Sequence, residues 1–88
     1  MRKNILDKSL KEDLSFRQAF LEGAFTVPGD GCIDYKPFLN LLKKNDYSGW
    51  LVVEAEQDPA KANPLKYAKI GHKYLSKICA EVNLEIIL

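Results

Sequence analysis

The sequence predicts an α/β fold that is incomplete by itself, and three observations lead to this prediction. An uninterrupted apolar run, Trp50 to Val53, is rich in β-branched residues and is typical of a parallel strand covered on both faces. Helical patterns precede and follow this run. The chain has 88 residues and offers at best one more short strand, whereas a covered strand needs sheet neighbours. We therefore expect the tail of a larger sheet or barrel.

The first third of the chain is predicted to contain one clear helix and one weaker candidate. Residues 4–13 have apolar side chains at helical spacing but are few and mostly charged, which indicates either a weak helix or a loop turn. Ser15 and Gln18 form a capping box at the start of a short helix, 16–22, and Gly23 is placed to end it. Turn-forming residues then predict a loop over 28–31.

Two longer helices are expected on either side of the apolar run. Asp34 is a suitable N-cap for a helix that reaches about Asn45. Asn63 followed by Pro64 predicts the start of a second helix, which extends to about Val82. The expected buried face of the first helix consists of Phe38, Leu39, Leu41 and Leu42. That of the second consists of Ala68, Gly71, Leu75, Ile78 and Val82.

Charge and composition argue against several classes of partner. Thirteen basic and twelve acidic residues leave a net charge of +1, which provides no concentrated basic field for nucleic acid or an anionic membrane. The two cysteines, Cys32 and Cys79, have neither the number nor the spacing of a disulfide framework or a zinc site, so we expect reduced thiols. Without a long apolar run or a signal peptide, a cytoplasmic protein is expected.

Two carboxylates after the apolar run are the first candidates for chemistry. Glu54 follows the predicted strand directly, at the end where α/β barrels hold their catalytic groups. Side chains alternate along a strand, so Glu54 and Glu56 would point to the same side if the strand stayed regular. The spacing does not choose between them, and both could also be solvated carboxylates of a loop.

Three stretches, 25–34, 47–59 and 60–68, carry a family resemblance. The pattern Gly-x-Gly-x-x-Asp, a helix, and then Gly-Trp-x-x-x-Glu is shared across the xylose isomerase-like group of sugar isomerases and epimerases. The run Glu-Ala-Glu-Gln-Asp-Pro-Ala-Lys-Ala-Asn-Pro is narrower. Through it the chain resembles the C-terminal end of the inosose dehydratases, also called 2-keto-myo-inositol dehydratases.

The resemblance implies a fold and an activity. The fold would be a C-terminal fragment of a (β/α)8 TIM barrel, about its last two βα units, with residues 1–88 as one partial domain that is mostly helical around one buried parallel strand. The activity would be that of a metal-dependent lyase that dehydrates inosose, a polyol ketone, in myo-inositol catabolism. The resemblance implies manganese or cobalt as the divalent metal. The chain alone would be inactive.

The resemblance also ranks the carboxylates. Glu54 takes the place of the eighth-strand glutamate that binds the metal, and Glu56 is the second choice. The remaining ligands, together with the general acid and base, would come from earlier strands. His72 lies within the last predicted helix and is not expected in the site. The loop around 28–31 could touch substrate through Phe25 or Asp30.

Alternatives to the dehydratase fragment remain at this point. One is a sugar isomerase or epimerase of the same group. Another is a freestanding, non-catalytic oligomerising domain derived from it, although such a domain should have replaced or paired the apolar strand. In either case the exposed strand and the helix faces predict that the chain associates with itself. The apolar end, 84–88, is predicted to be an extra strand, a packing tail or a contact with a partner.

Overall fold

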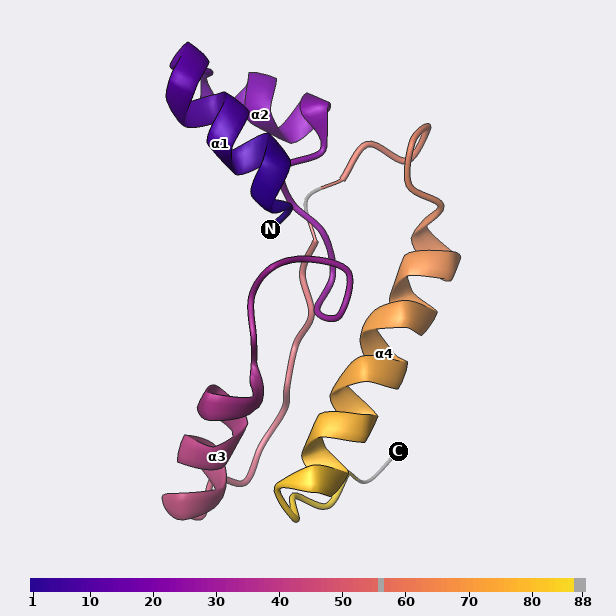
Figure 1. Cartoon of the computed structure of the whole chain (residues 1–88). Helices are drawn as coiled ribbons and strands as arrows, with labels where there is room; N and C mark the ends of the chain where they lie inside the picture. The colour runs from indigo at the N-terminus through magenta and orange to yellow at the C-terminus, as the bar shows by residue number, and fades with distance from the viewer. Residues whose placement is uncertain (56, 87–88) are drawn as a thin grey trace.

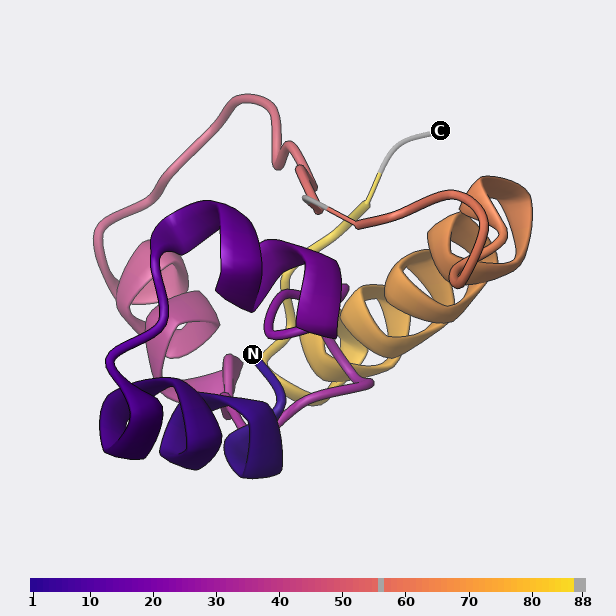
Figure 2. The ribbon, with the colours of Figure 1, turned by 90° about the horizontal axis from the view of Figure 1, so that it is seen from above.

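The structure, a computed structural model, describes residues 1–55 and 57–86 of the chain and is built from helices and drawn-out segments (Figure 1). The helices in this part are α1 (Lys3–Glu12), α2 (Phe16–Glu22), α3 (Lys36–Lys44) and α4 (Pro64–Glu81). Contacts between helices join α1 to α2 and α3 to α4. The molecule is elongated, with extents of 41 × 26 × 18 Å, and Figure 2 shows it from above.

The helices α1 and α2 form the first pair. The weak pattern over 4–13 is a complete helix, α1, although none of its residues is buried. The capping box of α2 is confirmed, since the backbone N–H of Gln18 donates to Ser15 Oγ at 3.2 Å and that of Ser15 donates to Gln18 Oε1 at 2.9 Å. Gly23 follows α2 in the left-handed conformation (φ 91°), which favours glycine.

The last helix, α4, begins as predicted. The Asn63 side chain accepts a hydrogen bond from the backbone N–H of Lys66 at 3.0 Å, and Pro64 occupies the first helical position. Gly71 is buried in the middle of α4, where an added Cβ would lie 3.3 Å from the Val27 side chain. The loop therefore approaches α4 closely at this glycine. In the described part of the chain, no helix is long and apolar enough to cross a membrane.

The core lies between α3 and α4. It is formed by Leu39 of α3 with Ile78, Cys79 and Val82 at the end of α4. Of the face predicted for α3, Leu39 is buried and Leu42 packs against this core, but Phe38 and Leu41 are 59% and 58% exposed. That prediction was wrong for these two residues because α4 covers only one side of α3.

The start of α3 also differs from the prediction. Its N-cap position is Tyr35, and the helix begins at Lys36. Asp34 still accepts a hydrogen bond from the backbone N–H of Lys36 at 3.0 Å. Asp34 therefore supports the turn that leads into the helix and lies one residue before the observed cap position, Tyr35.

The buried parallel strand is not confirmed. Within residues 1–55 and 57–86 no segment forms a β-strand, and 50–53 runs as a drawn-out segment beside α4 (Figure 1). Trp50 and Val52 are 87% and 82% exposed. A strand requires a neighbour for its backbone hydrogen bonds, and the described chain supplies no second strand. The α/β character predicted from this run therefore does not appear in the chain alone.

Candidate functional site

The side of the drawn-out segment on which Glu54 lies can be read from the exposure of its neighbours. Exposed fractions alternate along the segment: 87% at Trp50, 42% at Leu51, 82% at Val52 and 42% at Val53. This period of two is that of an extended chain with one face covered. Leu51 and Val53 belong to the less exposed face, which lies toward α4. Glu54 has the parity of Val52 and is exposed, and like Val52 it does not line the groove toward α4, whereas Trp50 does.

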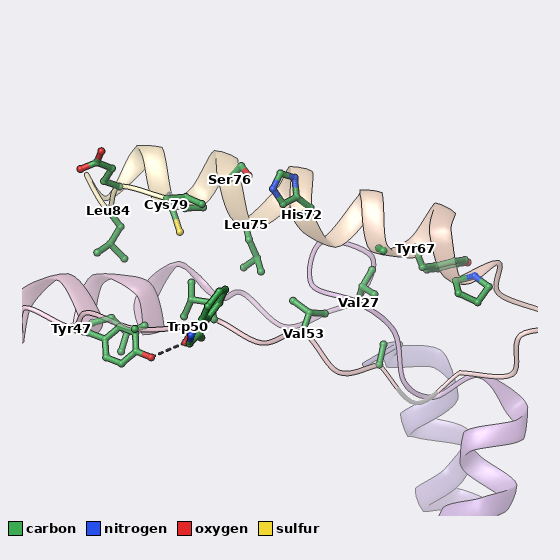
Figure 3. A pocket seen from close by; sticks show the side chains of 18 of the residues that line it. Val27, Tyr47, Trp50, Val53, Tyr67, His72, Leu75, Ser76, Cys79 and Leu84 are labelled. Atoms are coloured by element: carbon green, nitrogen blue, oxygen red, sulfur yellow. Dashed lines mark hydrogen bonds between the residues drawn. The ribbon is translucent and has the colours of Figure 1, made fainter. Parts of the chain in front are cut away.

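A groove separates the segment from α4 (Figure 3). Its volume is about 860 Å³, and its walls are mostly apolar. Trp50, Leu51 and Val53 line one side, Leu75 and Cys79 line the α4 side, and neither Val52 nor Glu54 is among the lining residues. The groove therefore lies between the 50–53 segment and α4, and the candidate carboxylate does not line it.

His72, which we did not expect in the site, lies on α4. It is exposed on α4 and lines the groove. Figure 3 shows its ring at the α4 side, opposite the segment that carries Trp50 and Val53. Glu54 does not line the groove, so the imidazole and the carboxylate do not share it.

The Glu54 carboxylate is the type of ligand that divalent metals prefer, but it supplies only one of the ligands that such a metal needs. Carboxylate oxygen is a preferred ligand of hard divalent cations, which take about six ligands including water. Among residues 1–55 and 57–86 there is no group of three or more His, Cys, Asp or Glu side chains that could hold a metal ion. Glu56, the second choice, lies outside the described residues, so its rank against Glu54 stays a prediction.

A polar cluster around Arg2, which the sequence analysis did not find, holds the loop before α3. The Arg2 guanidinium pairs with Asp30 at 3.0 Å and donates to the hydroxyl of Tyr67 at 3.3 Å. Thr26 donates to the same Asp30 oxygen at 2.7 Å, and the Gln57 amide donates to Thr26 at 3.4 Å. Segments up to 65 residues apart in sequence therefore meet here, and no local pattern could have indicated it.

The two loop residues that we expected near substrate are engaged within the chain. Asp30 accepts hydrogen bonds from Arg2 and Thr26. The ring of Phe25 packs against that of Phe16, with 5.2 Å between centroids. Gln57, three residues after Glu54, ties the end of the drawn-out segment to this loop through Thr26. The Arg2 cluster thus positions the loop and the segment end relative to each other.

The thiols are both free, as predicted, but differ in exposure. Cys32 is exposed in the loop before α3, and Cys79 is 1% exposed in the core. Burial raises the pKa of the Cys79 thiol above its ordinary value because the thiolate would lose hydration. Neither cysteine lies at the candidate site.

Comparison with known proteins identifies the family to which the chain belongs. The sequence pattern of the family described as xylose isomerase-like TIM barrel matches residues 6–78, and the chain belongs to this family. Among relatives, the inosose dehydratase of Bacillus velezensis is 58% identical over 74 residues, and that of Bacillus licheniformis is 58% identical over 76. The rhizopine catabolism protein MocC of Rhizobium meliloti is 50% identical over 86 residues. The resemblance to the inosose dehydratases is thus confirmed.

These matches cover most of this chain but little of the relatives. They span 84%, 86% and 98% of the chain, in the order given above. They span 25%, 25% and 26% of the relatives, so the chain corresponds to about a quarter of their length. The family match supports the α/β barrel origin of a segment that is helical in the structure of the chain alone.

Proposed function

We propose that this chain supplies the eighth-strand region of a metal-dependent hydro-lyase that dehydrates inosose, with Glu54 as one ligand of the metal. The observation that carries the proposal is the match at 58% identity to inosose dehydratases over a region that contains Glu54. The proposed metal is manganese or cobalt, the substrate is a small polyol ketone, and the compartment is the cytoplasm. Charge balance argues against nucleic acid or a membrane as partner.

The position of Glu54 relative to α4 supports the ligand role. In a (β/α)8 barrel the helices cover the outer side of the strands, and catalytic groups gather at the strand ends above the barrel interior. Leu51 and Val53 face α4, so Val52 and Glu54 lie on the side that the barrel interior would occupy. Glu54 also follows the apolar run directly. Both its side and its end of the strand are therefore those of a catalytic carboxylate.

The remaining residues at the strand end would orient and shield this carboxylate. A divalent ion bound at such a site supplies Lewis-acid polarisation of a substrate carbonyl oxygen. Gln57 and Thr26 would hold the backbone just beyond Glu54 against the loop, through their 3.4 Å hydrogen bond. Val52 would fill the barrel interior below Glu54 and exclude water there. The general acid and base are not assigned to residues of this chain.

A chimera tests the proposal. In the Bacillus velezensis relative, the segment that this chain matches is replaced by the matching residues of this chain, and the purified product is incubated with inosose and manganese or cobalt. We expect formation of the dehydrated dione by the chimera and none by the 88-residue chain alone, because one carboxylate cannot hold the metal. The unmodified relative serves as the reference.

Two outcomes would contradict the proposal. The first is a chimera that is folded by circular dichroism and binds metal but forms no dione, and the second is dione formation by the chain alone. Isomerisation or epimerisation of a sugar by the chimera, without loss of water, would instead support the second candidate, a sugar isomerase or epimerase, which rests on the family match alone.

A further inference from the structure

Among residues 1–55 and 57–86, Thr26 is the only buried polar residue, with an exposed fraction of 8%. Its hydroxyl donates to Asp30 Oδ2 at 2.7 Å and accepts from Gln57 Nε2 at 3.4 Å. Removal of a buried hydroxyl that is bonded in this way leaves both partners without a hydrogen bond. Thr26 therefore joins the loop before α3 to the end of the segment that carries Glu54.

The direction of each hydrogen bond around Thr26 follows from the chemistry of the groups. The Arg2 guanidinium has only donors, and the Asp30 carboxylate has only acceptors. One oxygen of Asp30 accepts from Arg2 at 3.0 Å and also from the Thr26 hydroxyl. The single hydroxyl proton is thus used on Asp30, so Thr26 can only accept from Gln57. Hydrogen bonds that run in one direction polarise and strengthen one another.

Glu54 lies between two hydrogen bonds that fix the segment around it. Within the described residues, 48–55 form no backbone-to-backbone hydrogen bond. Before Glu54, the Tyr47 hydroxyl donates to the Trp50 carbonyl at 2.7 Å. After Glu54, the amide of Gln57 is held by its bond to the loop, three residues further along the chain. The contact of Gln57 therefore limits where the chain can go once it has passed the carboxylate.

We propose that Thr26 is a positioning residue for Glu54: by holding the Gln57 amide, its hydroxyl sets the path of the chain beyond Glu54 and thereby the orientation of the carboxylate toward the metal. This inference rests on the proposed ligand role of Glu54 and adds the part that the loop plays in it. Groups that orient a ligand change metal affinity by about 10- to 100-fold without touching the metal. Thr26 acts through several residues, so we expect the lower end of this range.

Manganese binding by the chimera, measured by calorimetric titration of protein shown to be folded by circular dichroism, is the first test. Thr26→Val keeps the branched shape and removes the hydroxyl, so it should raise the dissociation constant for manganese by about tenfold. Thr26→Ser keeps the hydroxyl and should restore most of the affinity. Ser15→Ala is the control, because it removes a hydroxyl that caps α2. It should lower the melting temperature without changing the dissociation constant.

A second variant tests the other end of the same hydrogen bond. Gln57 is half-buried, and Gln57→Met keeps the length of the side chain while it removes the amide. It should weaken manganese binding as much as Thr26→Val does, and the double variant should be no weaker than either single one, because all three lose the same bond. Gln57→Met also serves where Thr26→Val does not fold. Unchanged affinity in Gln57→Met would overturn the inference.

A cycle with Glu54→Gln separates this inference from the proposed function. In the Glu54→Gln background, Thr26→Val should cause no further loss of affinity, because its effect passes through the missing carboxylate. If Glu54→Gln weakens binding while Thr26→Val has no effect, or has the same effect in both backgrounds, the positioning role is wrong and the ligand role of Glu54 stands. If Glu54→Gln leaves manganese binding unchanged, both are wrong.

Discussion

Arg2 is the residue that connects the most distant parts of the sequence. Its guanidinium donates to the Gly23 carbonyl at 2.8 Å, pairs with Asp30 and lies over the Tyr67 ring, with 5.8 Å to the ring centroid. The pair with Asp30 is partly shielded, with side chains 28% and 35% exposed. Each hydrogen bond contributes little to stability by itself, but removal of the guanidinium leaves several acceptors without their donor.

Replacement of Arg2 should therefore destabilise the chain. We expect Arg2→Ala to lower the free energy of unfolding by about 1 to 2 kcal/mol, measured by thermal or urea unfolding. Arg2→Lys should recover only part of this loss, because an ammonium cannot reach the carbonyl and carboxylate partners as a planar fork. Lys11→Ala, at an exposed position in the last turn of α1, is the control. Equal losses at Arg2 and Lys11 would show that the Arg2 cluster contributes no stability.

The cysteines give a second prediction at this scale. In the native chain Cys32 should react rapidly with iodoacetamide and Cys79 slowly, because the thiolate is the reactive species and burial raises the pKa of Cys79. Mass spectrometry after timed alkylation measures both sites. Raising the pH should increase the difference in absolute rate, and denaturant should abolish it. Comparable native rates would mean that the core between α3 and α4 opens readily.

At the scale of elements, the cap of α4 can be tested separately from tertiary packing. Asn63→Ala removes the side-chain acceptor of the Lys66 N–H and should cost about 1 kcal/mol of stability, seen as a lower midpoint in circular dichroism. Asn63→Asp keeps an acceptor and should stay near the wild type. If Asn63→Ala melts like the wild type, the first turn of α4 is frayed and the cap contributes nothing.

Helix ends were predictable because their signals are local. Ser15, Gly23 and Asn63 act within a few residues, through bonds to the nearest backbone groups. The exposure of Phe38 and Leu41 was not predictable, because it depends on which side of α3 the distant α4 covers. The same holds for the Arg2 cluster, whose members come from segments that no periodic pattern relates.

Whether the apolar run 50–53 forms a β-strand could not be predicted from its sequence pattern alone. Its composition predicts a strand, and the alternating exposure of Trp50 to Val53 is that of an extended chain. Whether such a chain becomes a strand depends on partners, which the described residues do not provide. For the candidate site, the sequence pattern could indicate Glu54 and its side of the chain. The further metal ligands that the family resemblance implies could not be derived from these residues.

At the scale of the whole molecule, the helix pairs and the open groove are consistent with one part of a barrel. The groove of about 860 Å³ lies between the segment and α4. The exposed Val52 does not line this groove, in contrast to its neighbours Leu51 and Val53. The chain spans about a quarter of its relatives, and its structure exposes the surfaces that a barrel buries.

Paired substitutions in the chimera test whether Glu54 holds the metal. Glu54→Gln keeps the volume but removes the anionic ligand, so we expect metal content and dione formation to fall by more than about tenfold, with only partial rescue by excess metal. Glu56→Gln, the control, should retain both, and circular dichroism should show both variants folded. Loss of activity with Glu56→Gln but not with Glu54→Gln would move the ligand by two residues, and full activity in both variants would contradict the account.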